Sequence, residues 1–331
     1  AGRAAQKAST NQPREYLIKL KLYEILLAIG ASVALFFESP IGLLFVLTGF
    51  GIQSAYIGPL KYSLLPKIAS GTNLLSANAW MESITFVAIL IGTIIGTDWI
   101  HANPPKLLAF TWITFAVIGF LSIIQFPEIV PEKQSAHVQS LPELIHEQRR
   151  DPAIMSSIWM ISAFWGTGSV WLISLPQLAT EHWSLSSQSV TQLMGLFVIG
   201  IAIGAGLGVA ARKKPIIKRI RFGAFTLAFG SFISMYPDPL IGSSGLIITA
   251  IGGGFYALPL YNFLQENTLE VADRIAVNNV ANALFISIIA VLSACVGYFK
   301  LPVAFWLFII AVFQLFFSFY HCRNLKINIF H

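Results

Sequence analysis

The chain has 331 residues, of which 56% are hydrophobic and only 11% are charged, and its formal net charge is +6. This composition excludes an ordinary soluble domain, because the apolar runs are too long and too numerous to be core helices of a globular fold. The positive charge does not indicate nucleic-acid binding, since no groove-like combination of basic and aromatic residues accompanies it.

Ten apolar runs follow one another along the chain, each of roughly 17–24 residues and so long enough to cross about 30 Å of hydrocarbon as a helix. They lie near residues 16–37, 41–64, 74–97, 107–126, 153–177, 187–209, 220–237, 241–264, 275–297 and 301–321. The runs are continuous and do not alternate, which disfavours membrane strands. We therefore predict an all-α membrane protein with ten transmembrane helices.

The basic residues predict which side of the membrane each loop faces. If the amino-terminal end is cytoplasmic, all but two of the 21 Lys and Arg residues fall on the cytoplasmic side, the exceptions being Lys106 and Lys300. Such a bias is typical of cytoplasmic loops, and an even number of helices then places both ends of the chain there. The polar, basic start has no apolar h-region, so we interpret Ala1 as lying in a cytoplasmic loop and not in a signal peptide.

Two stretches 200 positions apart repeat each other. The first is Tyr56-Ile57-Gly58-Pro59-Leu60, followed by Leu64 and Asn78, and the second is Tyr256-Ala257-Leu258-Pro259-Leu260, followed by Leu264 and Asn278. In both, a Gly-rich apolar run precedes a Pro-Leu pair, and the next apolar run opens on the Asn. Many secondary transporters arise by such duplication and bind substrate between the related halves. The repeat therefore indicates transport.

The longest polar stretch, 127–151, divides the chain into unequal parts, with four runs before it and six after it. The repeat falls on runs two and three of the first part and on runs four and five of the second. Two related halves should have equal counts, so the first half is two helices short of a 6+6 arrangement. We expect a truncated amino-terminal half at 1–126 (helices 3–6), a cytoplasmic linker at 127–151 and a carboxyl-terminal half at 152–331 (helices 7–12).

The 6+6 arrangement resembles the major facilitator superfamily, and two motifs resemble its lysophospholipid transporter branch. They are Gly58-Pro59-Leu60-Lys61-Tyr62-Ser63-Leu64-Leu65-Pro66 with Leu75, Ala77-Asn78 and Glu82, and Pro259-Leu260-Tyr261-Asn262-Phe263-Leu264-Gln265-Glu266 with Asn278-Asn279 and Asn282-Ala283-Leu284-Phe285. The resemblance implies alternating-access movement of lysophospholipid across a bacterial inner membrane, most simply inward for re-acylation, without a cofactor or metal.

Two other functions remain open at this point. One is export of drug-like or other amphiphilic compounds by the same superfamily fold. The other is a membrane anchor for an acyltransferase without transport, because similar sequences also form the membrane half of fusions with a phospholipid acyltransferase and an acyl-carrier-protein ligase. His146 and Asp151 match the His-x4-Asp of glycerolipid acyltransferases, but the partner motif is missing downstream. We interpret 141–150 as an amphipathic linker helix and the chain as a non-enzyme.

Charge inside a membrane is costly and usually functional, and Glu82 is the clearest case in this chain. It lies four residues after Asn78, so both face the same way on a helix. Lys61 is near enough in the chain to pair with Glu82. The pair is either a polar latch that binds a headgroup or couples gating, or a structural cap between two helices. Glu24 is interpreted as a solvated boundary residue.

The resemblance also implies which helices line the central cavity. Its inward candidates are Gln53, Ser54, Tyr56, Trp165, Thr167, Ser169, Trp171, Tyr256, Tyr261 and Asn262, and further substrate-binding or gating candidates are Lys61, Tyr62, Asn78, Glu82, Asn278 and Asn282. Aromatic surface with hydroxyls and amides suits an amphiphile that has an acyl tail and a zwitterionic head. Ordinary interface or lipid-facing aromatics are the alternative for any one of these residues.

Glycine spacing predicts close helix approach at two places. Gly200, Gly204 and Gly208 form one small-residue ridge, and Gly92 and Gly96 form another. By analogy with the superfamily these two helices meet across the halves, so we interpret the ridges as a rocking interface, with static packing inside one half as the alternative. Cys295 and Cys322 are interpreted as buried, inert thiols.

Overall fold

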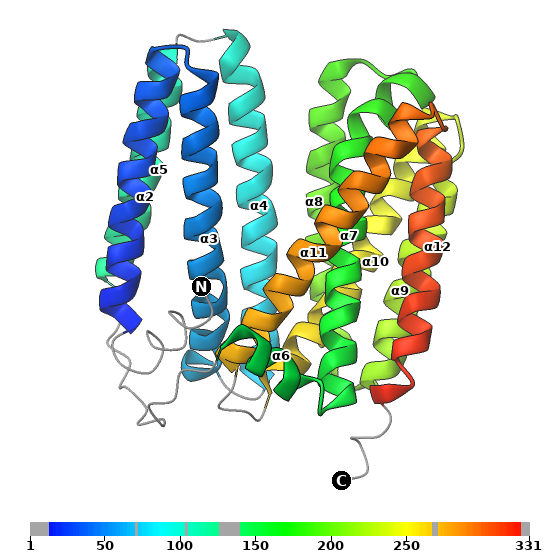
Figure 1. The fold of residues 1–331 in the computed structure, drawn as a ribbon. Coiled ribbons are helices and arrows are strands. Elements are labelled where there is room, and N and C mark those ends of the chain that lie inside the picture. Colours follow the sequence, from blue (N-terminus) through cyan, green and yellow to red (C-terminus); the bar gives the residue numbers. More distant parts are fainter. Residues whose placement is uncertain (1–12, 70–71, 103–104, 126–139, 267–270, 326–331) are drawn as a thin grey trace. The chain divides into compact units, whose positions relative to one another are not determined.

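The computed structural model describes residues 13–69, 72–102, 105–125, 140–266 and 271–325, and within them the fold is helical (Figure 1). The helices are α2 (Pro13–Phe36), α3 (Pro40–Ile68), α4 (Thr72–Ala102), α5 (Pro105–Ile124), α6 (Leu141–Gln148), α7 (Pro152–Gln177), α8 (Ser187–Ala210), α9 (Ile216–Ile233), α10 (Pro239–Gln265), α11 (Val271–Tyr298) and α12 (Val303–His321), with short η1 (Leu178–His182) and η2 (Ala211–Lys213). Each of the ten predicted runs coincides with a helix. The predicted linker helix is confirmed as α6.

Seven candidate membrane spans occur among the described residues, judged by length and composition. They are Pro40–Ile68, Leu107–Ile124, Pro152–His182, Ser189–Lys213, Pro239–Gln265, Asp273–Tyr298 and Val303–His321. The helices α2, α4 and α9 are not in this set. α2 carries several charges in its first half and α9 carries three basic residues in its first turns. An all-helical membrane fold is therefore confirmed, while the full count of ten spans stays a prediction.

Two of the long helices begin with the same Asp-Pro signal. The Asp151 carboxylate accepts hydrogen bonds from the backbone N–H groups of Ala153 and Ile154 at 2.8 and 3.2 Å, at the start of α7. Asp238 does the same at the start of α10, with both distances 2.9 Å. The proline that follows each Asp occupies the first helical position, where a missing N–H costs nothing.

The internal repeat has the same order of helices in its two copies. In the first copy, α3 ends at Ile68 and α4 begins at Thr72; in the second, α10 ends at Gln265 and α11 begins at Val271. In both copies one long apolar helix thus ends and a second begins a few residues later, at positions just under 200 residues apart. The pairs α3–α4 and α10–α11 in Figure 1 are these copies.

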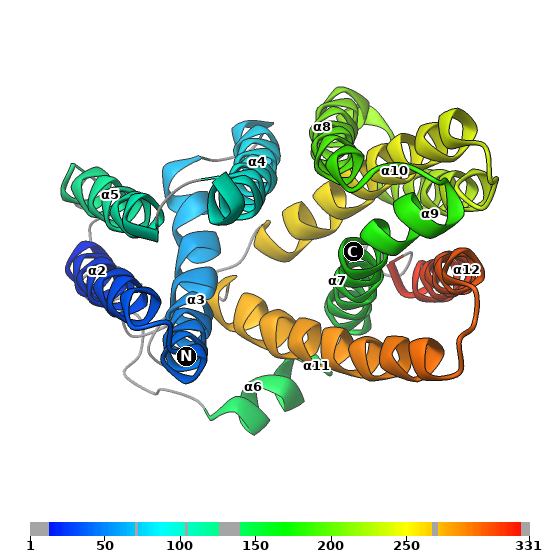
Figure 2. The ribbon, with the colours of Figure 1, turned by 90° about the horizontal axis from the view of Figure 1, so that it is seen from above.

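The chain divides into two compact units by its contacts. The first contains residues 1–68, 92–144 and 269–276, and its described core is formed by α2, α3 and α5 (Figure 2). Leu17, Leu60 and Leu64 form a small apolar cluster there. The Arg14 guanidinium donates to the carbonyl oxygen of Ile124 at 2.7 Å, which ties the start of α2 to the end of α5.

The second unit contains residues 69–91, 145–268 and 277–331. In it α10 packs closely on both α8 and α9, and α12 packs on α7 and α9 (Figure 2). Glycines make the α10 contacts close: a Cβ at Gly204 would collide with the carbonyl oxygen of Ile251, and a Cβ at Gly254 with that of Ile201. Small residues allow backbones to approach in this way where lipid, and not water, surrounds the helices.

The unit boundaries differ in two places from the predicted cut at 127–151. Residues 69–91, the first part of α4, group with the second unit, and residues 269–276 group with the first. Residues 126–139 of the predicted linker lie outside the described part of the chain. The division into halves 1–126 and 152–331 therefore stays a prediction.

Candidate functional site

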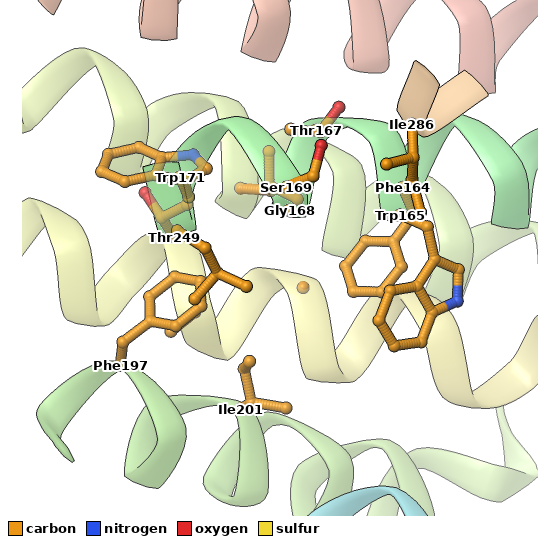
Figure 3. A pocket seen from close by; sticks show the side chains of 14 residues that line it. Phe164, Trp165, Thr167, Gly168, Ser169, Trp171, Phe197, Ile201, Thr249 and Ile286 are labelled. Carbon is orange, nitrogen blue, oxygen red and sulfur yellow. The ribbon is translucent and has the colours of Figure 1, made fainter. Parts of the chain in front are cut away.

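A cavity of about 210 Å³ lies inside the second unit (Figure 3). Its walls come mainly from α7, α8 and α10. Figure 3 shows Trp171 and Phe197 at one end and Phe164 and Trp165 at the other. The predicted inward residues Trp165, Thr167, Ser169 and Trp171 all line it. A cavity this size is smaller than the roughly 300–1,000 Å³ of whole-ligand pockets, so it suits part of an extended molecule.

Glycine and aromatic residues together keep this cavity open. A Cβ at Gly168 would meet no atom within 4 Å, while a Cβ at Gly253 would come within 3.1 Å of the Phe164 ring. Trp171 and Phe197 stack with ring centroids 6.4 Å apart. Broad aromatic walls without a charged side chain favour an apolar ligand held by contact area.

Most polar groups in the cavity wall already have a hydrogen-bond partner. Trp165 Nε1 donates to the Tyr261 hydroxyl at 2.6 Å, and the hydroxyls of Ser169 and Thr249 donate to carbonyl groups of their own helices at 2.7 and 2.9 Å. Trp171 differs: its side chain is 2% exposed, yet its indole N–H has no hydrogen-bond partner within the described residues. A buried donor without a partner costs about 1–3 kcal/mol, so this N–H is an unsatisfied buried group beside the cavity.

A buried hydrogen-bond network lies behind the cavity and joins α7, α10 and α12. Thr167 donates to the Gln314 amide oxygen at 3.3 Å, and the Gln314 amide nitrogen donates to the Ser318 hydroxyl at 3.3 Å. The Tyr256 hydroxyl lies 2.8 Å from that of Ser318. The structure therefore brings the predicted residues Thr167 and Tyr256 into one network. Sequence reasoning missed Gln314 and Ser318, although two polar residues four apart in an apolar run are a usable signal.

The structure places Asn78 in a buried amide pair. Gln265 Nε2 donates to Asn78 Oδ1 at 2.8 Å, and the two side chains are 1% and 0% exposed. Beside them, Leu75 and Ala79 of α4 pack on Ala205 of α8 and on α10. The pair thus joins the start of α4 to the end of α10, inside the second unit. Gln265 belongs to the second repeat motif, which begins at Pro259, but its hydrogen bond with Asn78 was not predicted.

The two other asparagines of the repeat differ from each other. Asn282 Oδ1 accepts a hydrogen bond from the Ser162 hydroxyl at 2.8 Å, which links α11 to α7. Asn278 is fully buried, and neither polar atom of its amide has a partner among the described residues. Asn78 and Asn278 occupy corresponding positions in the repeat, and both are therefore buried. Only Asn78 has a hydrogen-bond partner among the described residues.

The first unit holds a charged cluster that the sequence did not predict. Glu24 forms an ion pair with Lys21 at 2.9 Å and accepts a hydrogen bond from Gln53 Nε2 at 2.6 Å. The interpretation of Glu24 as a solvated boundary residue is wrong, because its side chain is only 19% exposed and faces α3. Gln53 is buried, and its role as an inward-facing substrate residue stays a prediction.

The remaining candidates of the first unit lie along α3. Tyr56 is half-buried and Tyr62 is buried, and the Lys61 ammonium lies 5.0 Å from the centre of the Tyr62 ring. Glu82 belongs to α4, but its side chain lies outside the described residues. The predicted pairing of Lys61 with Glu82 accordingly stays a prediction.

The glycine ridge of α8 faces a different helix from the one expected. Cβ atoms at Gly200, Gly204 and Gly208 would meet Ala250, Ile251 and Leu258 of α10. This ridge therefore packs inside the second unit against α10, and its placement against α4 is wrong, because the first turns of α4 contact α8 through Ala205 instead. On α4, a Cβ at Gly92 would meet nothing within 4 Å, and the surroundings of Gly96 are outside the described part.

The two residues of the enzyme-like pattern lie at the junction of α6 and α7. Asp151 caps α7, as described above, and His146 is exposed on α6. Cys322 is buried as predicted, but Cys295 is exposed, so its interpretation as a buried thiol is wrong: it lies on an exposed stretch of α11.

These features define a class: a helical membrane protein that encloses an apolar cavity and a buried polar network. The chain belongs to the Major Facilitator Superfamily, whose family profile matches residues 24–294.

Curated relatives narrow the comparison. The lysophospholipid transporter LplT of Enterobacter sp. (strain 638) is 28% identical over 261 residues, which cover 76% of this chain and 64% of that protein. LplT of Serratia proteamaculans (strain 568) is 28% identical over 240 residues, covering 69% and 60%. The chain thus spans less than two thirds of the length of these two relatives.

Solved structures share the fold at low sequence identity. The human organic anion transporter MFSD10 (TETRAN) matches with a TM-score of 0.80 at 13% identity, over 97% of this chain and 79% of that one. A bacterial homologue of the iron transporter ferroportin, in an outward-facing state, matches with a TM-score of 0.73 at 14% identity, over 98% and 86%.

Proposed function

We propose that the protein is a secondary transporter that moves lysophospholipid across the bacterial inner membrane by alternating access, inward, to supply re-acylation. The observation that carries the proposal is the aromatic, uncharged cavity between α7, α8 and α10. Similarity to proteins named lysophospholipid transporters supports the same substrate. An acyl chain is bound by apolar area, and a few hydrogen bonds orient the polar end.

The proposed topology has ten spans, with both ends of this chain in the cytoplasm. The cluster Arg212, Lys213 and Lys214 at the end of α8 is exposed and supports a cytoplasmic position for that end. In this proposed topology α7 begins on the cytoplasmic side at Pro152 and runs outward, so Trp171 lies nearer the outer side of the membrane than Trp165.

We propose that the buried Asn78–Gln265 pair holds the cytoplasmic ends of α4 and α10 together in one state of the cycle. An amide pair suits this role, because it can break and be replaced by water when the ends separate, without stranding a charge. Lys61 and Glu82 stay candidates for a second latch at the same side, and Gly92 and Gly96 for a sliding surface on α4.

Transport by the protein reconstituted in liposomes tests this function. The probe is a fluorescent lysophosphatidylethanolamine, and a lipophilic drug-like cation is assayed in parallel. We expect time-dependent movement of the lysophospholipid above that of protein-free liposomes. Movement of the drug-like cation alone would favour export of amphiphiles, and movement of neither would favour the role of an acyltransferase anchor.

A further inference from the structure

A second cavity, of about 570 Å³, lies in the same unit. It lies where α7 and η1, the last turns of α11 and the start of α12 come together. On α7, residues up to Leu172 line the first cavity and residues from Ile173 onward line the second. On α11, Ile286 lines the first cavity and residues from Ala290 onward line the second. The two cavities therefore follow each other along the same two helices.

The second cavity, unlike the first, carries two opposite charges. Glu181 of η1 and Lys300 of the α11–α12 turn both line it. The Glu181 carboxylate accepts a hydrogen bond from Gln177 Nε2 at 2.7 Å, whereas the Lys300 ammonium makes no hydrogen bond or ion pair with any described residue. The backbone of Lys300 is held in a left-handed turn (φ 53°), with its N–H donating to the carbonyl oxygen of Gly297 at 3.1 Å. The two charged side chains thus line one cavity without forming an ion pair with each other.

Lys300 is also unusual in the sequence. It is one of two basic residues that the predicted topology leaves outside the cytoplasm, where Lys and Arg are generally scarce. A basic residue that occurs there and lines a cavity is therefore a candidate for binding an anionic group. A single ammonium binds phosphate as a point charge.

We propose that the second cavity binds the zwitterionic headgroup of a phospholipid with one acyl chain. The phosphate lies at Lys300 and the headgroup ammonium at Glu181, while the acyl chain occupies the first cavity. The ester group lies between the headgroup and the acyl chain, near the Trp171 side chain that lines the first cavity. Ten residues separate Trp171 from Glu181, about 15 Å along a helix, which requires a ligand with an apolar end and an extended polar end. This inference rests on the proposed function and adds the headgroup site to it.

Binding measured on the purified protein in maltoside micelles tests the proposal, because that detergent carries no competing phosphate. The probes are lysophosphatidylethanolamine (zwitterionic), lysophosphatidylglycerol (anionic) and a monoacylglycerol of the same chain (uncharged). The variants are Lys300→Ala and Glu181→Gln, with Lys213→Ala as a matched control, since Lys213 is also exposed but lies on η2, outside both cavities.

Lys300→Ala should weaken both charged lipids by about three- to fivefold, the range of an exposed ion pair. Glu181→Gln should weaken only lysophosphatidylethanolamine by a similar factor. Neither variant should change monoacylglycerol binding, and Lys213→Ala should change none of the three. Equal affinities of both variants and wild type for all probes would overturn the headgroup site while leaving the proposed function intact.

Two further outcomes test the identity of the ligand, because diacyl phospholipid of the bilayer carries the same headgroup as lysophospholipid. If diacyl phosphatidylethanolamine binds as tightly as the lyso form and is equally sensitive to Lys300→Ala, the site takes bilayer lipid, and its assignment to lysophospholipid is refuted. If wild-type protein binds no lysolipid at all, the proposed function itself fails.

Discussion

Replacing Gly168 with leucine should fill the first cavity without disturbing the fold. Gly168 lines that cavity, and a Cβ built on it meets no atom within 4 Å, so the new side chain enters empty space. Leucine is also a better helix former than glycine by about 0.8 kcal/mol, so α7 should be no less stable. The substitution therefore separates occupancy of the cavity from integrity of the protein.

The expected loss of affinity follows from the volume taken. Leucine places four carbon atoms where about four methylenes of an acyl chain would lie. Each buried methylene contributes about 0.8 kcal/mol, so their exclusion costs about 3 kcal/mol, or about two orders of magnitude in Kd. The smaller Gly168→Ala should cost about a quarter of that, which makes the series graded.

Fluorescence titration with lysophosphatidylethanolamine measures the affinity, and the thermal unfolding midpoint in the same detergent measures integrity. Gly206→Leu is the matched control, because Gly206 is exposed on α8 and a Cβ there also meets nothing within 4 Å. Unchanged affinity of a well-folded Gly168→Leu protein would show that the acyl chain binds elsewhere, and the assignment of this cavity would then be refuted.

Three other substitutions test the packing that surrounds the cavity. Gly204→Ala should lower the unfolding midpoint, because its Cβ collides with the α10 backbone and overpacking costs about 1–3 kcal/mol. The control Gly206→Ala should leave the midpoint unchanged, and equal midpoints of the two variants would contradict the α8–α10 contact. Asn78→Leu should destabilise by about 1–3 kcal/mol by stranding the buried Gln265 amide, and adding Gln265→Leu should restore part of this loss; an additive double variant would argue against the pair. Asp151→Ala should cost about 1 kcal/mol by removing the α7 cap, while Asp151→Asn should behave as wild type; a defect in both would point to a role other than capping.

The sequence predicted the helices well, because continuous apolar runs of membrane length have few alternatives. All ten runs coincide with helices, and each copy of the repeat forms two successive long helices. The amphipathic stretch 141–150 was likewise predicted as a helix, and residues 141–148 form α6. Each of these helices is determined by residues close together in the sequence, so a local pattern is enough to predict it.

Side-chain partners depended on the tertiary structure. Periodicity placed Gly204 on a ridge but could not show that the ridge faces α10, since two helices of similar composition offer similar surfaces. The sequence predicted Glu24 to be a solvated boundary residue, and only the tertiary structure shows its contacts with Lys21 and Gln53.

The separate charges of Glu181 and Lys300 are 119 positions apart in sequence, and no local pattern joins them. By itself, the sequence determined where the chain becomes helical, because hydrogen bonding inside a bilayer leaves the backbone little choice. Which side chains meet across those helices was decided only by packing between segments distant in the chain.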